Sequence, residues 1–204
     1  MIYLVGGAPR LGKSTVAREA MKRLSVSWES TDTIRSAVNA ALSPASRARF
    51  LPFASVADHD EVFRRATETI IEQQLTEART LEGPLEAYLA DHAMTDEPII
   101  LEGLHLTPAF IKKIAESRPF NNKIRAVMLL APTTEILLRD IQASHGHHDW
   151  LRGKSDETHK AAVEFILQFS KRLESEIDEN LVAVIRRSDD FARDTAAAVT
   201  ALIE

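Results

Sequence analysis

Short runs of apolar residues recur along the chain and are separated by longer stretches with helical periodicity. The runs are near-continuous rather than alternating, which is typical of parallel strands covered on both faces. Strands that alternate with helices predict a parallel sheet with right-handed crossovers. The expected strands are Ile2–Val5, Val26–Trp28, Ile99–Leu101, Ile124–Leu130 and Leu181–Ile185. The pattern therefore predicts an α/β fold with a five-stranded parallel sheet flanked by helices.

Apolar residues at helical spacing predict the helices between these strands. After the first strand, one helix face carries Val16, Ala17, Ala20, Met21 and Leu24. Similar faces are expected over residues 62–78 and 162–177, the second with Ser155 or Asp156 as a plausible N-cap. The segment 43–98 is too long for a simple crossover, so we expect it to form a helical insertion beside the sheet.

Composition narrows the class of protein. The chain has 204 residues, of which 45% are hydrophobic and 27% charged, an ordinary balance for one globular domain over residues 1–204. Cysteine is absent, which excludes disulfides, thiolate metal sites and a thiol nucleophile. No apolar run reaches membrane-spanning length, and the glycines directly after Val5 are unlike a signal peptide. We therefore expect a cytoplasmic protein.

Charge argues against a nucleic-acid partner. The net charge is -5, and residues 58–97 hold eleven Asp or Glu and three Arg. Such a surface repels phosphate backbones. We expect a small-molecule partner, with no nucleic acid and no membrane, and the oligomeric state stays open.

The first apolar run leads into a stretch that fits G-x-x-x-x-G-K-[ST] without a mismatch. Gly7 and Gly12 allow a tight curl that points successive N–H groups inward, and the following helix adds its positive N-terminal end. Lys13 supplies a charge to the β- and γ-phosphates, and the Ser14 hydroxyl is a hard ligand for Mg²⁺. The predicted nucleotide-binding residues are Gly7, Ala8, Pro9, Arg10, Leu11, Gly12, Lys13, Ser14 and Thr15.

A strand–turn–helix with incidental glycines is the alternative, which the full match and the apolar strand before it disfavour. Pro9 has no N–H, but a cradle built by later residues can spare one donor. Arg10 either reaches a phosphate or points to solvent.

The stretch Ser30-Thr31-Asp32-Thr33-Ile34-Arg35 follows the second strand. In a parallel sheet the loops after strands collect at one edge, so this loop is expected near the glycine-rich loop. Asp32 could orient or deprotonate an attacking hydroxyl, or hold Mg²⁺ through water. Arg35 would face the same way and could clamp an anionic acceptor. The competing interpretation is that Asp32 only caps a helix over Thr33–Leu42.

The stretch Glu102-Gly103-Leu104-His105 follows the third strand. Glu102 is a candidate for the Mg²⁺ shell or for a substrate hydroxyl, because an acid at that strand end lies beside the phosphate loop. His105 could donate a hydrogen bond to an acceptor, or it could be a loop histidine satisfied by backbone groups.

Residues 137–155 follow the fourth strand and carry arginines in a glycine-containing segment. Phosphoryl transfer needs cations over the transferring group and exclusion of water, and a lid with arginines supplies both. Arg139 and Arg152 are the catalytic candidates, with Lys154 behind them. The cluster His145, His147, His148 and Asp149 is either a metal site or a solvated lid tip.

These motifs, taken in order, resemble the 2-phosphoglycerate kinase family within the P-loop kinases. The matching segments are Gly6–Thr15, Ser30–Arg35 and Ile99–Pro108. The resemblance implies a kinase-type five-stranded parallel sheet, with ATP and Mg²⁺ as donor and a small phosphorylated or hydroxylated acceptor. It implies that Lys13 and Ser14 hold ATP and Mg²⁺. It further implies that Asp32, Arg35, Glu102 and His105 line the acceptor pocket.

The expected function is thus an ATP-dependent small-molecule kinase, with Lys13, Asp32, Arg139 and Arg152 as catalytic residues and the insertion over 43–98 on the acceptor side. One alternative is a nucleotide-binding sensor without phosphoryl transfer. Another is a kinase that acts on a nucleic-acid end, a nucleotide, an antibiotic or a toxin-like sugar substrate. The segment 186–190 is placed to touch the adenine, although no physical argument from it excludes guanine.

Overall fold

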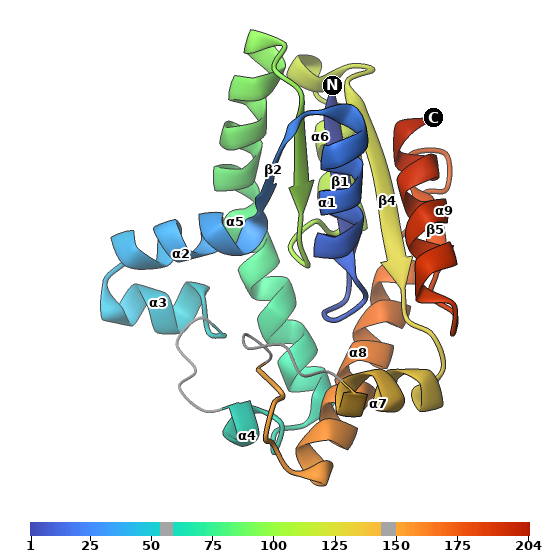
Figure 1. The fold of residues 1–204 in the computed structure, drawn as a ribbon. Helices are drawn as coiled ribbons and strands as arrows, with labels where there is room; N and C mark the ends of the chain where they lie inside the picture. The colour runs from blue at the N-terminus through green and yellow to red at the C-terminus, as the bar shows by residue number, and fades with distance from the viewer. Residues whose placement is uncertain (54–58, 144–149) are drawn as a thin grey trace.

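The computed structural model describes residues 1–53, 59–143 and 150–204, and its centre is a parallel sheet (Figure 1). The sheet has five strands in the order β2-β3-β1-β4-β5. The strands are β1 (Ile2–Gly7), β2 (Ser27–Ser30), β3 (Ile99–Glu102), β4 (Ile124–Leu130) and β5 (Ala183–Arg186). All four neighbouring pairs are parallel. The predicted α/β sheet is confirmed, and each expected strand lies within two residues of its observed ends.

Helices cover both faces of the sheet. Helices α1 and α9 contact each other and the strands on one face, while α5 and α8 contact each other on the opposite face (Figure 1). The helices are α1 (Lys13–Leu24), α2 (Thr31–Ala41), α3 (Pro44–Phe50), α4 (His59–Val62), α5 (Thr67–Thr95), α6 (Pro108–Ala115), α7 (Thr134–Ala143), α8 (Asp156–Glu174) and α9 (Phe191–Ile203). A 3-10 helix, η1 (Arg118–Phe120), precedes β4.

The core lies between the sheet and these two helical layers. The side chains of β3 are buried along the whole strand, as are the last five residues of β4. Burial on both faces explains why these strands are runs of apolar residues, without polar alternation. In the described residues, no helix is both long and apolar enough to cross a membrane.

The insertion between β2 and β3 is helical, as predicted, and is dominated by the 29-residue helix α5. Helices α2 and α3 extend to one side of the sheet, and α5 begins beyond the carboxyl ends of the strands and runs back beside the sheet (Figure 1). A wall of helices therefore stands beside the sheet edge at which β1, β2 and β3 end. Side chains from α2 and α5 can reach the loop after β1 from there.

Candidate active site

The loop after β1 has the tight curl expected of a phosphate cradle. It connects Gly7 to the start of α1 at Lys13, and Gly7 and Gly12 have φ angles of 136° and 93°. A Cβ on Gly12 would lie 2.5 Å from a ring carbon of Phe191, so this position needs glycine for space as well as for its backbone angle. Arg10 also has a positive φ, of 63°. The N-terminal end of α1 therefore opens onto a tight backbone turn, an arrangement that binds anions.

Lys13 is held inside this turn. Its side chain is buried, and Nζ donates a hydrogen bond to the Ala8 carbonyl at 2.8 Å. Burial lowers the pKa of Lys13, and the nearby carboxylates of Glu102 and Asp32 counter that shift. The ammonium group therefore lies under the loop. Negative charge from a bound phosphate chain would stabilise its charged form there, which burial disfavours.

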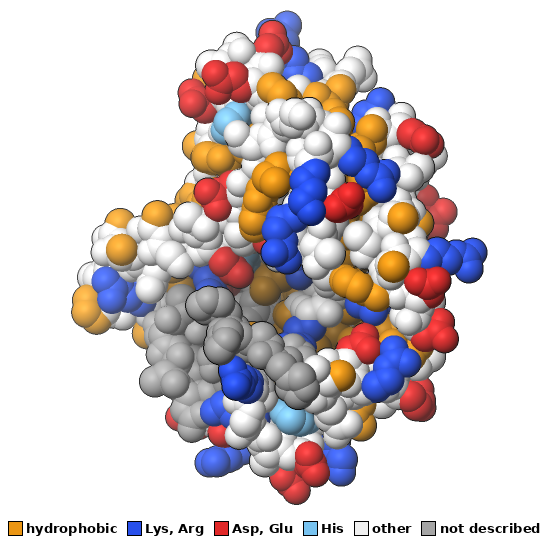
Figure 2. Space-filling model, viewed as in Figure 1, with side chains coloured by type: hydrophobic (Ala, Val, Ile, Leu, Met, Phe, Trp, Pro, Cys, Tyr) orange, Lys and Arg blue, Asp and Glu red, His pale blue; other side chains and the backbone are white. Residues whose placement is uncertain are grey.

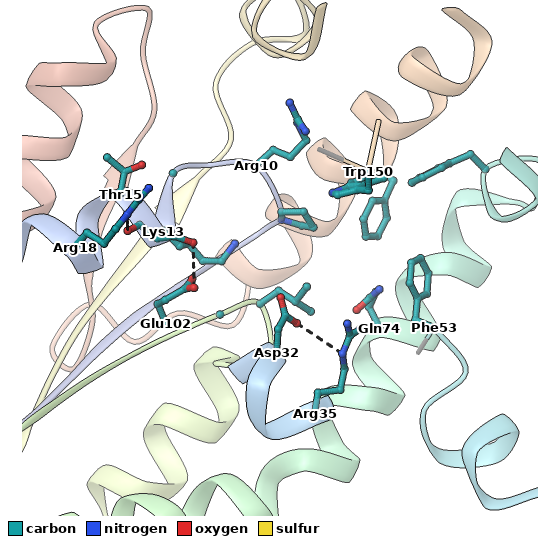
Figure 3. Close-up of a pocket in the computed structure, with 17 residues that line it drawn as sticks. Arg10, Lys13, Thr15, Arg18, Asp32, Arg35, Phe53, Gln74, Glu102 and Trp150 are labelled. Carbon is teal, nitrogen blue, oxygen red and sulfur yellow. Dashed lines mark hydrogen bonds and ion pairs between the residues drawn. The ribbon is translucent and has the colours of Figure 1, made fainter. Parts of the chain in front are cut away.

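Ser14, at the start of α1, lies next to Glu102, at the end of β3. Ser14 Oγ donates a hydrogen bond to Glu102 Oε1 at 3.0 Å, and Glu102 is paired in register with Val5 of β1 (Figure 3). A hydroxyl and a carboxylate are the hard oxygen ligands that Mg²⁺ prefers, so the donor chemistry fits this cation. Across the described residues, no group of three or more acidic or His side chains could hold a metal. A cation here would also need phosphate oxygens and water.

Asp32 lies in the first turn of α2 and not at its cap. The cap is Ser30, whose hydroxyl accepts a hydrogen bond from the Asp32 N–H at 3.3 Å. The capping interpretation of Asp32 is therefore wrong, because the helix begins two residues earlier than expected, at Thr31. The Asp32 side chain is 59% exposed and lines the pocket beside Lys13.

Arg35 is shared between two carboxylates. Its Nε lies 3.7 Å from Asp32 Oδ1, and its Nη1 lies 3.5 Å from Glu77 Oε2 on α5 (Figure 3). Glu77 is fully buried, and its other oxygen accepts a hydrogen bond from the backbone N–H of Phe53. A buried carboxylate needs such partners to remain charged. Arg35 therefore lines the pocket, but much of its charge is committed to Glu77.

His105 does not reach the pocket, contrary to the expectation that it faces the acceptor. Its side chain is fully buried, and Nδ1 lies 2.8 Å from Thr31 Oγ1. Burial lowers the pKa of His105 to about 4, so the ring is neutral near pH 7. The contact instead connects the end of β3 with the first residue of α2, one position before Asp32.

Many of the predicted site residues, but not His105, Arg139 or Arg152, line one pocket of about 660 Å³. Figure 2 shows the molecule hollowed below α1. One end is polar and is formed by the phosphate loop together with the carboxyl ends of the strands. The other end is aromatic. Polar-end residues are Arg10, Lys13, Ser14, Thr15, Arg18, Asp32, Arg35 and Glu102, and aromatic residues are Phe53, Phe63, Trp150 and Phe165. Gln74 also lines it, and its side chain points into the cavity in Figure 3.

A second pocket, of about 390 Å³, lies on the other side of the phosphate loop. It shares Arg10 and Gly12 with the first pocket and is also lined by Arg187 and Asp189, from the segment expected near the adenine. The Arg187 guanidinium lies 4.4 Å from the Phe191 ring centroid and 3.1 Å from Asp140. A flat cation of this kind offers a stacking surface for a planar base.

The two lid arginines lie apart from the first pocket. Arg139 lines the second pocket and pairs with Asp140 at 3.1 Å, and Arg152 is exposed and lines neither of these pockets. Residues 137–143 of the expected lid belong to α7. The His145–Asp149 cluster lies outside the described residues. A catalytic role for Arg139 and Arg152 stays a prediction.

Sequence reasoning missed Gln74, Glu77 and the aromatic wall. Gln74 and Glu77 lie three residues apart on one face of α5, where they were indistinguishable from the polar positions of an amphipathic helix. The aromatic residues come from four separate segments, and only tertiary structure brings them together. The available signal was weak: Gln74 and Glu77 directly precede the apolar Leu75 and Ala78, on the buried side of the 62–78 pattern.

Comparisons with known proteins agree with this fold. A sugar kinase from Janibacter sp. HTCC2649 aligns with a TM-score of 0.58 at 15% identity, covering 98% of this chain and 93% of that one. A gluconokinase from Sinorhizobium meliloti 1021 aligns with a TM-score of 0.52 at 14% identity, covering 98% and 90%. A shikimate kinase from Bacteroides thetaiotaomicron aligns with a TM-score of 0.51 at 12% identity, covering 98% and 94%.

No protein-family model and no curated protein sequence matches the chain. The comparisons therefore support the broader resemblance to P-loop kinases and do not confirm the narrower one to the 2-phosphoglycerate kinase family. At identities of 12–15% the likeness establishes the fold alone. The five-stranded parallel sheet flanked by helices is the fold of these solved kinases.

Proposed function

We propose that this protein is an ATP-dependent phosphotransferase that phosphorylates a hydroxyl group of a small molecule. The observation that carries the proposal is the meeting, in one pocket, of Lys13 and Ser14 from the phosphate loop with Glu102 and the exposed carboxylate of Asp32. A nucleotide sensor would need the first three groups only. Asp32 adds a proton acceptor at the place where a second substrate would enter.

The phosphate loop binds the ATP phosphates through backbone N–H groups and the Lys13 ammonium. Mg²⁺, when held by Ser14 Oγ and by Glu102 directly or through water, neutralises charge on the phosphate oxygens. Arg10 and Gly12 line both pockets, so a nucleotide whose phosphates occupy the loop can extend its base toward Arg187. The acceptor then occupies the pocket of Asp32 and Gln74.

In the transfer step, the acceptor oxygen forms a bond to the γ-phosphorus as the bond from that phosphorus to the β–γ bridging oxygen breaks. ADP leaves with the electron pair of the broken bond. The hydroxyl proton passes to Asp32 and then to water. Arg35, 3.7 Å from Asp32, orients that carboxylate toward the acceptor.

The resemblance to the 2-phosphoglycerate kinase family favours a phosphorylated hydroxy acid as acceptor. Such a compound carries its own negative charges, which need cations in the pocket. Arg35 lines the pocket beside Asp32 and is also engaged by the buried Glu77, and Arg18 lines the pocket from α1. 2-Phosphoglycerate therefore belongs in the acceptor panel together with uncharged hydroxyl compounds.

The test is ADP production in the presence of ATP, Mg²⁺ and a panel of hydroxyl-bearing metabolites. Lys13→Ala is expected to lower turnover by roughly a hundredfold or more, because it removes the charge that stabilises the transferring group. Asp32→Asn is expected to lower kcat by a similar factor while leaving ATP affinity nearly unchanged.

The matched controls are Lys22→Ala and Asp91→Asn. Lys22 is exposed in the last turn of α1, 3.5 Å from Glu19, and Asp91 is exposed on α5. Neither lines a described pocket. Full turnover in both Lys13→Ala and Asp32→Asn would reject the mechanism. ATP binding without ADP production across the panel would favour the sensor.

A further inference from the structure

We propose that the acceptor is an uncharged hydroxyl compound built on a planar, unsaturated ring whose edge exchanges hydrogen bonds with Gln74, as the base of a nucleoside would. The inference rests on the proposed phosphotransferase function and names the class of its acceptor. It is carried by the juxtaposition of an aromatic wall and a buried amide at the end of the pocket away from the phosphate loop.

The aromatic wall is concentrated in this one pocket. The chain has eight Phe, two Trp and two Tyr, and Phe53, Phe63, Trp150 and Phe165 all line it. Phe63 stacks on Trp150 with ring centroids 5.4 Å apart and planes 14° apart, and it packs at a tilt against Phe165. Phe53 and Trp150 are half-buried, so their rings belong partly to the pocket surface. Such rings favour a flat, polarisable ligand.

Gln74 is a buried polar residue at this aromatic end of the pocket. Its side chain is 3% exposed, and its Oε1 is buried without a hydrogen-bond partner among the described residues. Leaving a buried polar atom unpaired is costly, so such an atom in a pocket points to a ligand group. The amide end can present either an acceptor or donors, and it thus matches a ring edge that carries both.

The charge balance indicates a neutral acceptor body. Glu77 lies one helical turn after Gln74. It forms an ion pair with Arg35 and accepts a hydrogen bond from the Phe53 N–H. The pocket residues around Gln74 are therefore aromatic, apart from Arg35, whose charge is largely matched. An acceptor with its own phosphate and carboxylate would place two anions against this wall.

Size agrees with this assignment. A pocket of about 660 Å³ is in the range that holds drug-sized ligands. The polar end takes the transferring phosphate and the attacking hydroxyl. The aromatic end, which a three-carbon acid would not reach, takes the ring. In the view of Figure 3, Asp32 lies between Lys13 and Gln74, as required of a base that contacts the hydroxyl arm of such a compound (Figure 3).

Binding is tested through Trp150 fluorescence. The chain has two tryptophans, so a Trp28→Phe background leaves Trp150 as the reporter. The donor site is first filled with a non-hydrolysable ATP analogue and Mg²⁺, so that a nucleoside cannot bind there. Pyrimidine and purine nucleosides and hydroxymethyl pyridines are expected to change the emission saturably. 2-Phosphoglycerate and gluconate are expected not to do so.

Gln74→Leu and Gln73→Leu form the matched pair. Gln73 is the neighbouring residue on α5, accepts a hydrogen bond from Arg65, and does not line the pocket. Gln74→Leu is expected to raise the KM and the Kd of the best ring acceptor roughly tenfold, because one buried hydrogen bond is lost. Its KM for ATP stays unchanged. Gln73→Leu is expected to behave as the parent protein.

The possible outcomes distinguish failure of the proposed acceptor class from failure of the proposed phosphotransferase function. Phosphorylation of 2-phosphoglycerate or of a sugar acid, with no binding or turnover of ring compounds, overturns the acceptor class and leaves the phosphotransferase in place. Equal binding of ring compounds to the parent and to Gln74→Leu overturns the role of Gln74. Failure of ATP with Mg²⁺ to bind at all overturns the proposed function itself.

Discussion

The two carboxylates that flank Arg35 differ in their surroundings. Glu77 is fully buried and is held by Arg35 and a backbone N–H, while the Asp32 side chain is 59% exposed and touches Arg35 from the solvent side. Glu77 can thus fix the guanidinium without meeting substrate, and Asp32 stays accessible to an acceptor. One arginine serves both the packing of α2 against α5 and the orientation of the proposed base.

Replacing Arg35 should therefore affect stability as well as turnover. Arg35→Met is expected to lower the free energy of unfolding by about 2 kcal/mol, because it removes a cation that lies 3.5 Å from the buried Glu77 carboxylate. Urea denaturation measures the change. Adding Glu77→Gln should recover most of the loss. Arg79→Met, at an exposed pair 3.9 Å from Glu72, should change stability little. An Arg35→Met protein as stable as the parent contradicts this account.

His105 should make stability depend on pH. Its pKa is lowered to about 4 by burial, against 6.5 in an unfolded chain. Between pH 6.5 and 4 the His105 ring is protonated in the unfolded state but stays neutral in the folded state. The free energy of unfolding therefore falls as the pH drops from 6.5 towards 4. The loss should reach roughly 3 kcal/mol.

Urea denaturation between pH 7 and 4 measures this slope. His105→Gln should flatten the part of the slope that His105 contributes, and His92→Gln, which leaves His105 in place, should retain it. An unchanged slope in His105→Gln would show that the buried ring does not govern this pH range.

At the scale of elements, the end of β3 approaches the start of α2 closely. A Cβ on Gly103, directly after β3, would lie 1.7 Å from Thr31 Oγ1. Gly103→Ala must therefore push Thr31 away, and with it the neighbouring Asp32. We expect a loss of about 2 kcal/mol in unfolding free energy and a fall in kcat larger than any change in ATP affinity.

Gly83→Ala is the control for this prediction, since nothing lies within 4 Å of a Cβ built there on α5. It should change stability by less than about 1 kcal/mol. Denaturation and ADP production are measured on both variants. Equal behaviour of the two proteins would contradict the close approach of β3 and α2.

The strands and the phosphate loop could be predicted from the sequence because their signals are local. Runs such as Ile124–Leu130 are apolar throughout, and the glycine–lysine–serine spacing is set by the backbone geometry of a single turn. The long helix α5 was predicted only as far as residue 78, because Gly83 and Pro84 interrupt the expected periodicity. Helix packing overrides that local preference and carries α5 on to Thr95.

The acceptor pocket could not be predicted in the same way. The resemblance to the 2-phosphoglycerate kinase family placed His105 in the acceptor pocket, yet it pairs with Thr31 inside the protein. Phe53 and Phe165 are more than a hundred residues apart, and nothing local marks them as neighbours. Residues brought together by long-range packing need the three-dimensional structure.

At the scale of the whole molecule, the two pockets lie on opposite sides of the proposed phosphate loop. The pocket proposed for the nucleotide base is built with α7 and α9, and the pocket proposed for the acceptor is built with α2, α5 and α8. Mg²⁺ bound by Ser14 and Glu102 would lie where these two sides meet. Ligand effects on global stability should therefore depend on the cation.

Saturating ATP with Mg²⁺, at a hundred times its Kd, should stabilise the folded protein by about 2.7 kcal/mol. Chelation of Mg²⁺ should remove a large part of this effect in the parent. Ser14→Ala should resemble the chelated parent, and chelator should change that variant little further. Thermal unfolding measures all four conditions. Stabilisation that withstands chelation in the parent would place the cation elsewhere.

The strand order has a consequence for biosynthesis. β3 lies between β1 and β2, although it is made some seventy residues after β2 ends. While the ribosome is still translating the helical insertion, β1 and β2 have no strand between them, and β1 gains its other strand partner only with β4. The strand that leads into the glycine-rich turn therefore lacks both of its partner strands until β3 has been synthesised, and we expect nucleotide to assist folding only after that point.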